Sequence, residues 1–156
     1  MDMDKTYREF LSRVHREILK PAGFKKEGGN FRLFHDNGLC KIINFQRSMF
    51  NGGGECRFCI NVGLYMQPDP GNPNLKFKEY DCYVRIRAAK LDPTYGWDFW
   101  WSIFEGRDME KLFAEVQSTL TKSSLPWLEQ FSTPRDVIQA AQKGQFKGMG
   151  GNWKHI

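Results

Sequence analysis

The feature that most constrains the fold is a change in the spacing of apolar residues near residue 30. Over residues 4–20 apolar residues recur every three or four positions, which predicts an amphipathic helix with Asp4 as its N-cap. Beyond residue 30 apolar and polar residues alternate instead, which is typical of strands with one buried face. The chain therefore places a helix before a sheet, and the apolar stripe of that helix consists of Tyr7, Phe10, Leu11, Val14 and Ile18.

Five segments are the expected strands: residues 30–35, 39–48, 55–66, 80–88 and 97–104. Asp36-Asn37-Gly38 is a strong hairpin signal because Asn and Gly tolerate positive φ, and the glycines at 52–54 mark the next turn. Segments joined by such short turns pair as antiparallel neighbours. Because aromatic residues obscure the period of 97–104, we expect an antiparallel meander of about four or five strands.

Helices are expected to complete the chain. Residues 108–121 carry an apolar stripe at helical spacing, and residues 124–131 form a short helix or turn. Thr133-Pro134 begins another helix, with Pro at the first helical position, and Gly144 ends it. The sequence predicts an α+β fold with an N-terminal helix and two or three C-terminal helices. Residues 1–144 form a single domain, and 145–156 form a flexible glycine-rich tail.

Length and composition fit one soluble domain. The chain has 156 residues, of which 40% are hydrophobic, enough for one packed core. It contains no apolar run of the roughly 18 residues that span a bilayer, so we expect no membrane partner. Since its first residues are charged and lack the apolar stretch of a secretory signal, we expect a cytoplasmic protein. The four cysteines should then be reduced thiols.

Motifs for metal or covalent catalysis are incomplete in this sequence. Cys56 and Cys59 have the spacing of half a zinc site, but residues three apart in a strand point to opposite faces, and no second pair exists. His15, His35 and His155 have no partner at a spacing that indicates a catalytic triad. We therefore assign no catalytic residue, no metal ligand and no cofactor.

One face of the predicted sheet carries the residues of a candidate binding site. It lies opposite the apolar phase and combines amides, arginines and a tyrosine, the groups that bind carboxylates, phosphates or acidic protein surfaces. A solvated face with cross-strand pairs would show the same pattern. The tryptophans at 97, 100 and 101 are expected at its edge. The candidate residues are Asn44, Gln46, Ser48, Arg57, Asn61, Tyr83, Arg85 and Arg87.

Several short blocks resemble a bacterial family known as domain of unknown function 4304. They are LKPAGFKK at 19–26, INFQRS at 43–48, INVGLY at 60–65, CYVRIR at 82–87 and LPWL at 125–128. The resemblance covers roughly the first 130 residues. It implies a compact bacterial cytosolic domain without an established activity, catalytic residue or cofactor. Small bacterial domains of this kind often act as interaction modules, including antidotes to toxins.

Three hypotheses for function follow. The first is a non-enzymatic binding module that uses the polar face to contact a protein partner, with neutralisation of a toxin as one case. The second is a small anionic-ligand binder or enzyme with a pocket between that face and residues 97–101. Nucleic-acid binding ranks last, because the net charge of +5 is spread along the chain.

Overall fold

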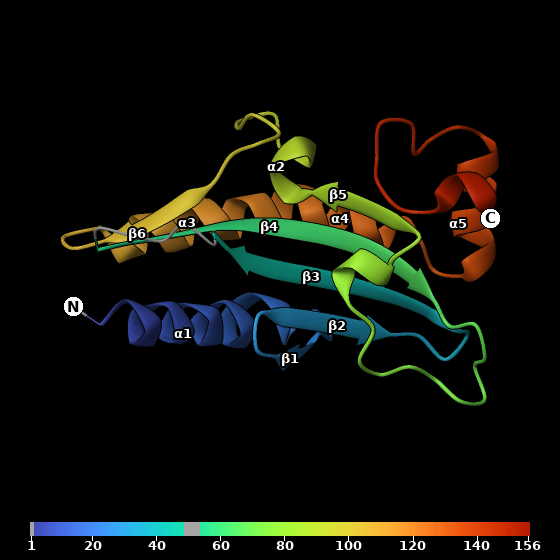
Figure 1. The fold of residues 1–156 in the computed structure, drawn as a ribbon, viewed down its shortest axis with the longest axis horizontal. Coiled ribbons are helices and arrows are strands. Elements are labelled where there is room, and N and C mark those ends of the chain that lie inside the picture. The colour runs from blue at the N-terminus through green and yellow to red at the C-terminus, as the bar shows by residue number, and fades with distance from the viewer. Residues whose placement is uncertain (1, 49–53) are drawn as a thin grey trace.

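The computed structural model describes residues 2–48 and 54–156, and within them six strands form one antiparallel sheet (Figure 1). The strand order is β1-β2-β3-β4-β5, and β6 pairs with the beginning of β4. The expected meander and α+β class are confirmed. The strands are β1 (Lys25–Glu27), β2 (Asn30–Phe34), β3 (Leu39–Arg47), β4 (Glu55–Met66), β5 (Val84–Arg87) and β6 (Trp101–Phe104).

The longer helices lie at both ends of the chain, as predicted, and the short η2 (Glu79–Asp81) and α2 (Ala88–Leu91) lie between β4 and β6. The first is α1 (Met3–Val14), extended by a π-helical turn, η1 (His15–Leu19). Its N-cap is Asp2, whose side chain accepts from the Lys5 amide; the expected cap, Asp4, instead binds Arg47. The other elements are α3 (Met109–Thr119), η3 (Leu120–Ser124), α4 (Leu125–Glu129), α5 (Pro134–Gln142) and η4 (Trp153–His155).

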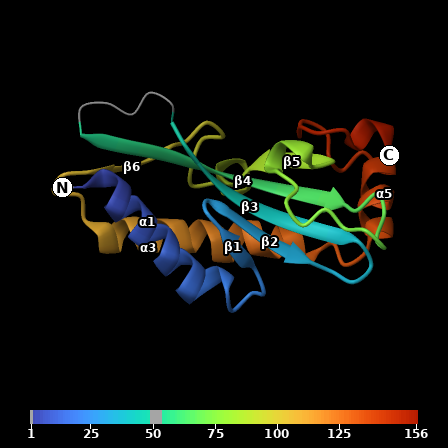
Figure 2. The same cartoon turned by 60° about the horizontal axis from the view of Figure 1, so that its bottom comes forward.

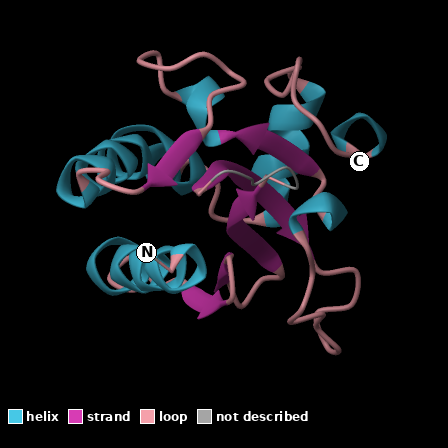
Figure 3. Ribbon diagram, turned by 60° about the vertical axis from the view of Figure 1, so that its left-hand side comes forward, coloured by secondary structure: helices cyan, strands magenta, loops and turns pink. Residues whose placement is uncertain are grey.

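The main core lies between the sheet and the helices α1 and α3. Both helices cover the same face, which Figures 2 and 3 show from two sides. Phe10 of α1 contacts Phe113 of α3 and Phe58 of β4, with ring centroids 6.4 and 5.7 Å apart. On the sheet itself a row of stacked and edge-on rings crosses four strands: Phe31, Phe45, Phe58 and Trp101. Bulky aromatic residues therefore fill the core, and Trp101 belongs to it.

A smaller core covers one end of the opposite face, and we name that whole face the second face. There the connection between β4 and β5 folds back over the strands, and Phe77 stacks on Tyr65 with centroids 4.3 Å apart. Cys82 packs over Gly63, where an added Cβ would lie 2.7 Å from the Cys82 sulfur. The strand predicted over 80–88 is thus shorter at its start: Tyr80 is exposed in η2, and Cys82 is buried on the second face.

Residues 145–156, expected as a loose tail, pack against the domain. Phe146 and Trp153 are buried, and their rings approach to 6.3 Å. Gly150 exchanges two backbone hydrogen bonds with Arg85 of β5, at 2.8 and 3.0 Å. The absence of periodicity made this segment look unstructured, whereas two isolated aromatic residues anchor it.

The sequence also predicted two turns between strands. The turn at Asp36-Asn37-Gly38 forms, with Gly38 at φ +93° and the Asn37 side chain accepting from the Leu39 amide. Residues 51–53 of the next turn lie outside the described residues.

No helix among residues 2–48 and 54–156 is both long enough and apolar enough to cross a lipid bilayer.

Candidate functional site

The amides of the second face form a hydrogen-bonded ladder across three strands. Asn44 donates to Asn30 at 2.8 Å, and Asn61 donates to both Asn44 and Gln46 at 3.0 and 2.9 Å. The register explains this arrangement, because Asn44 lies opposite Asn30 on one side and opposite Asn61 on the other. These amides therefore satisfy one another and fix the strand register. Of the four, Gln46 is the one that is exposed.

Beside the ladder, two arginines lie near the same tryptophan ring. The guanidinium carbon of Arg87 lies 5.2 Å from the Trp100 ring centroid, and that of Arg57 lies 5.8 Å from it. Both are within the range of a cation–π interaction. Arg87 is the register neighbour of Asn61, so β5 brings the pair of cations to the ladder. We call this surface the Arg–Trp patch: Gln46, Arg57, Arg87, Trp97 and Trp100.

Arg87 is incompletely paired. Its Nη1 atom makes no hydrogen bond within the described part of the chain, and its ion-pair partner, the Asp98 carboxylate, lies 3.8 Å away. Strong guanidinium–carboxylate bonds are about 2.7–2.9 Å long. Trp97, one residue before Asp98, is 66% exposed. The patch thus combines an under-used cation with an exposed indole.

The remaining predicted site residues have other surroundings. Arg85 binds Glu79 through two hydrogen bonds of 2.9 and 3.1 Å, which ties η2 to β5. Tyr83 precedes β5 and its ring lies 6.2 Å from Tyr65, at the end of the second face covered by the smaller core. Ser48 follows β3, and its amide donates to the Arg57 carbonyl. The structure therefore brings Asn44, Gln46, Asn61, Arg57 and Arg87 together and gives Arg85 a partner within its own chain.

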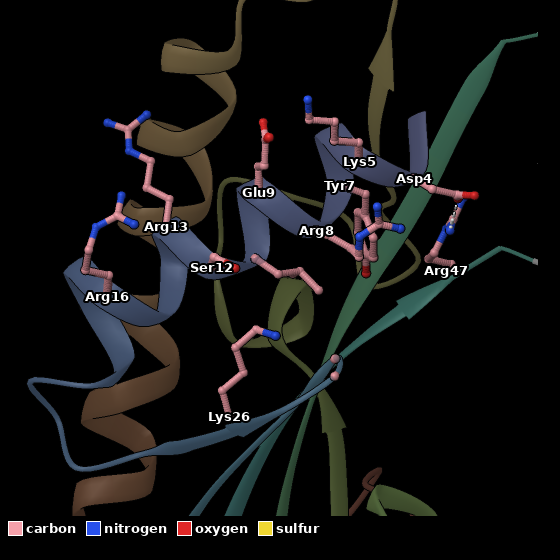
Figure 4. Close-up of a pocket in the computed structure, with 13 residues that line it drawn as sticks. Asp4, Lys5, Tyr7, Arg8, Glu9, Ser12, Arg13, Arg16, Lys26 and Arg47 are labelled. Carbon is pink, nitrogen blue, oxygen red and sulfur yellow. Dashed lines mark hydrogen bonds and ion pairs between the residues drawn. The ribbon is translucent and has the colours of Figure 1, made fainter. Parts of the chain in front are cut away.

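A second polar region was not recognised in the sequence. It is a groove of about 1010 Å³ between α1 and the turn that joins β1 to β2 (Figure 4). Its lining contains six cations and two acids. We call it the basic groove, and its charged residues are Lys5, Arg8, Arg13, Arg16, Lys26 and Arg47 with Asp4 and Glu9.

A family model covers most of the chain. Residues 15–130, more than half of the chain, match the family described as Domain of unknown function (DUF4304). The chain belongs to this family. No curated protein and no solved structure matches it.

The DUF4304 match covers one of the two candidate regions completely and the other only in part. It contains all six strands of the sheet and, separately, every residue of the Arg–Trp patch. The basic groove lies partly outside it, because Lys5 and Arg8 precede residue 15. The patch is thus part of the family's domain, while one wall of the groove lies outside the match.

The cysteines of this DUF4304 chain are poor nucleophiles. Burial raises the pKa of the Cys59 thiol to about 11, and it raises the pKa values of Cys40, Cys56 and Cys82 as well. A thiol must ionise to attack, so these four would react slowly near neutral pH. All four are free and buried. Within the described ranges, no three His, Cys, Asp or Glu side chains gather as a metal site.

The hypothesis of a pocket beside the tryptophans finds no support in the pockets lined by residues 2–48 and 54–156. Asn61, Arg87 and Trp100 line none of five pockets found on the described part of the chain. The Arg–Trp patch is therefore better suited to a surface contact than to enclosing a small molecule.

Proposed function

We propose that this DUF4304 domain is a cytoplasmic protein-binding module whose Arg–Trp patch receives an acidic segment of its partner. The observation that carries the proposal is the pair of arginines, Arg57 and Arg87, whose guanidinium carbons lie 5.8 and 5.2 Å from the Trp100 ring centroid. Arginine and tryptophan are the residue types most enriched at binding hot spots. The four free, buried cysteines are consistent with a reducing compartment.

The chemistry of the patch favours a carboxylate as the group it binds. Asp98 already places a carboxylate near Arg87, but the distance of 3.8 Å and the exposure of Asp98 make this a weak ion pair. The Arg87 side chain is 27% exposed although its Nη1 atom is buried, so a partner carboxylate would form shorter, charge-assisted bonds with the exposed part of the guanidinium. Trp97, the residue before Asp98 in the chain, is exposed and supplies apolar surface for a partner.

Selection from a random peptide library displayed on phage tests this function, because it needs no candidate partner. The wild-type domain should enrich peptides rich in Asp and Glu. Binding of those peptides to the Arg57→Ala/Arg87→Ala variant should weaken at least about tenfold, which corresponds to about 1.4 kcal/mol. Fluorescence polarisation with the selected peptides measures the change.

A matched variant controls for the loss of charge. Arg135→Ala/Lys143→Ala removes two cations at exposed positions on and beside α5, which lies at the opposite end of the molecule from β6 in Figure 1. It should bind the selected peptides like the wild type. Peptides that bind the Arg57→Ala/Arg87→Ala variant undiminished, or a selection without acidic enrichment, would exclude the patch as the site. Circular dichroism melts verify that both variants are folded.

A further inference from the structure

The basic groove has a line of cations along one wall. Lys5, Arg8, Ser12 and Arg16 follow one another at intervals of three or four residues, so they project from one side of α1 and its extension. At about 1.5 Å of rise per residue, the eleven steps from Lys5 to Arg16 span about 16 Å. The positive charges on this wall are therefore spread along a line and do not converge on a single point.

The opposite wall is held in place by the β1–β2 turn. Figure 4 shows Lys26 of β1 pointing toward α1 across the groove. The turn is clamped to β3, because the Phe45 amide donates to the Gly29 carbonyl at 2.8 Å. A Cβ at Gly29 would lie 2.7 Å from the Phe45 oxygen, so this close approach requires glycine. A fixed backbone thus places a lysine opposite the helix.

Three of the cations that line the groove form no ion pair with a described residue. Arg13 binds Glu17 and Glu110, and Arg47 binds Asp4. Lys5, Arg8 and Lys26 are exposed and form no ion pair with any residue in 2–48 or 54–156. Such cations are available to replace the counterions of a polyanion.

We propose that the basic groove binds the sugar–phosphate backbone of a single-stranded nucleic acid without reading its sequence. Cations on both walls of an elongated groove suit a strand that carries a phosphate at every nucleotide. A contact with a protein segment would need exposed apolar anchors. The apolar lining side chains, Tyr7 and Leu11, are instead buried. This proposal is independent of the Arg–Trp patch, with which the groove shares no residue.

Fluorescence polarisation with a labelled oligothymidylate of about 15 nucleotides provides the test. The variant is Lys5→Gln/Arg8→Gln/Lys26→Gln in the full chain, and it should bind at least about tenfold more weakly at low salt. The slope of log affinity against log salt should also decrease by about 2, since each contacted phosphate contributes about 0.7 on single strands.

The control variant Arg135→Gln/Lys143→Gln/Lys147→Gln removes the same charge from exposed positions at the other end of the molecule (Figure 1). Its affinity should change less than about threefold. An equal loss of affinity in both variants would mean that binding depends on net charge alone. That result would contradict the groove as the binding site. So would failure of the wild type to bind, or competition by oligoglutamate as strong as that by the unlabelled oligonucleotide.

A loss of affinity could also result from misfolding, so a variant that is expected to gain affinity provides a second test. Glu9 lines the groove and makes no ion pair with another described residue. Glu9→Gln removes that negative charge and should tighten oligonucleotide binding by about threefold. Asp36→Asn removes the same charge in the β2–β3 turn and should leave the affinity unchanged. Equal effects of the two substitutions would contradict the proposed location.

Discussion

Tyr7 has a buried hydroxyl that makes no hydrogen bond within the described part of the chain. Its ring lies between Phe58, 5.7 Å away, and the Arg47 guanidinium, 5.1 Å away. Burial raises the pKa of this hydroxyl well above its ordinary value, so it stays protonated at neutral pH. A buried donor without a partner costs about 1–3 kcal/mol.

Removing this hydroxyl should therefore stabilise the protein. Tyr7→Phe keeps the ring contacts and is expected to raise the free energy of unfolding by about 1 kcal/mol. Urea denaturation measures the change. Tyr80→Phe serves as the control, because Tyr80 is exposed and its hydroxyl is solvated. Destabilisation by Tyr7→Phe would show that the hydroxyl has a partner in solution.

For individual residues, the alternation of apolar and polar positions predicted which side chains share the second face. It did not predict which of these side chains contact one another. Asn44, Gln46 and Asn61 could be assigned to one face from the sequence, and they lie there. Their mutual hydrogen bonds depend on register, which alternation does not provide. Arg85 could not be separated from Arg87, because its partner Glu79 lies outside every helix and strand that the sequence predicted.

Among the secondary-structure elements, the sequence did not predict β1. It therefore did not predict the basic groove either, because β1 carries Lys26 on one wall of the groove. The three residues of β1, Lys25–Glu27, are all charged, so they show no apolar alternation. The strand exists because it pairs with β2 and because Gly29 is clamped to β3. Such an element depends on tertiary contacts, so local propensity could not reveal it. The longer strands β3 and β4 carry enough alternation to be predicted within about a residue or two of their ends.

The connection between β4 and β5 is held on the second face by an ionic cluster. Arg32 is buried and donates to the Phe77 carbonyl at 2.9 Å and to Glu27 at 2.9 Å. Glu27 also binds Lys76 of the connection. Hydrogen bonds from Lys76 and then Arg32 lower the pKa of Glu27 from 4.5 to about 2. The cluster thus joins β1, β2 and the connection.

This cluster makes stability dependent on pH. Because the folded protein holds the pKa of Glu27 below its unfolded value, ionised Glu27 favours folding above about pH 4.5, and this contribution is lost as the pH falls toward about 2. Glu27→Gln should be less stable than the wild type near neutral pH, and the difference should shrink across that interval. Urea unfolding at several pH values measures it.

A second substitution tests whether Lys76 is the source of the effect. In a Lys76→Met background the pH-dependent difference caused by Glu27→Gln should be smaller, since Arg32 alone remains as partner. A difference that is constant with pH would show that the cluster does not set the pKa of Glu27.

In the molecule as a whole, the C-terminal segment covers part of the outer edge of the sheet. β5 is the last strand in the order, and Gly150 occupies its outer edge by pairing with Arg85. An uncovered edge strand invites pairing with another chain. Phe146 and Trp153 bury their rings against the body in the same segment. These residues lie beyond the DUF4304 match, which ends at residue 130, yet they complete the domain.

Deletion of residues 145–156 should therefore destabilise the protein and promote self-association. Losing the burial of two aromatic side chains costs about 3–6 kcal/mol at about 1.5–3 kcal/mol each. The exposed edge of β5 would then favour dimers or aggregates. Urea denaturation measures the first effect, and size-exclusion chromatography measures the second. Gln145→Ala, which alters an exposed position of the same segment, should change neither property. An unchanged stability and a monomeric truncated chain would show that the segment is dispensable.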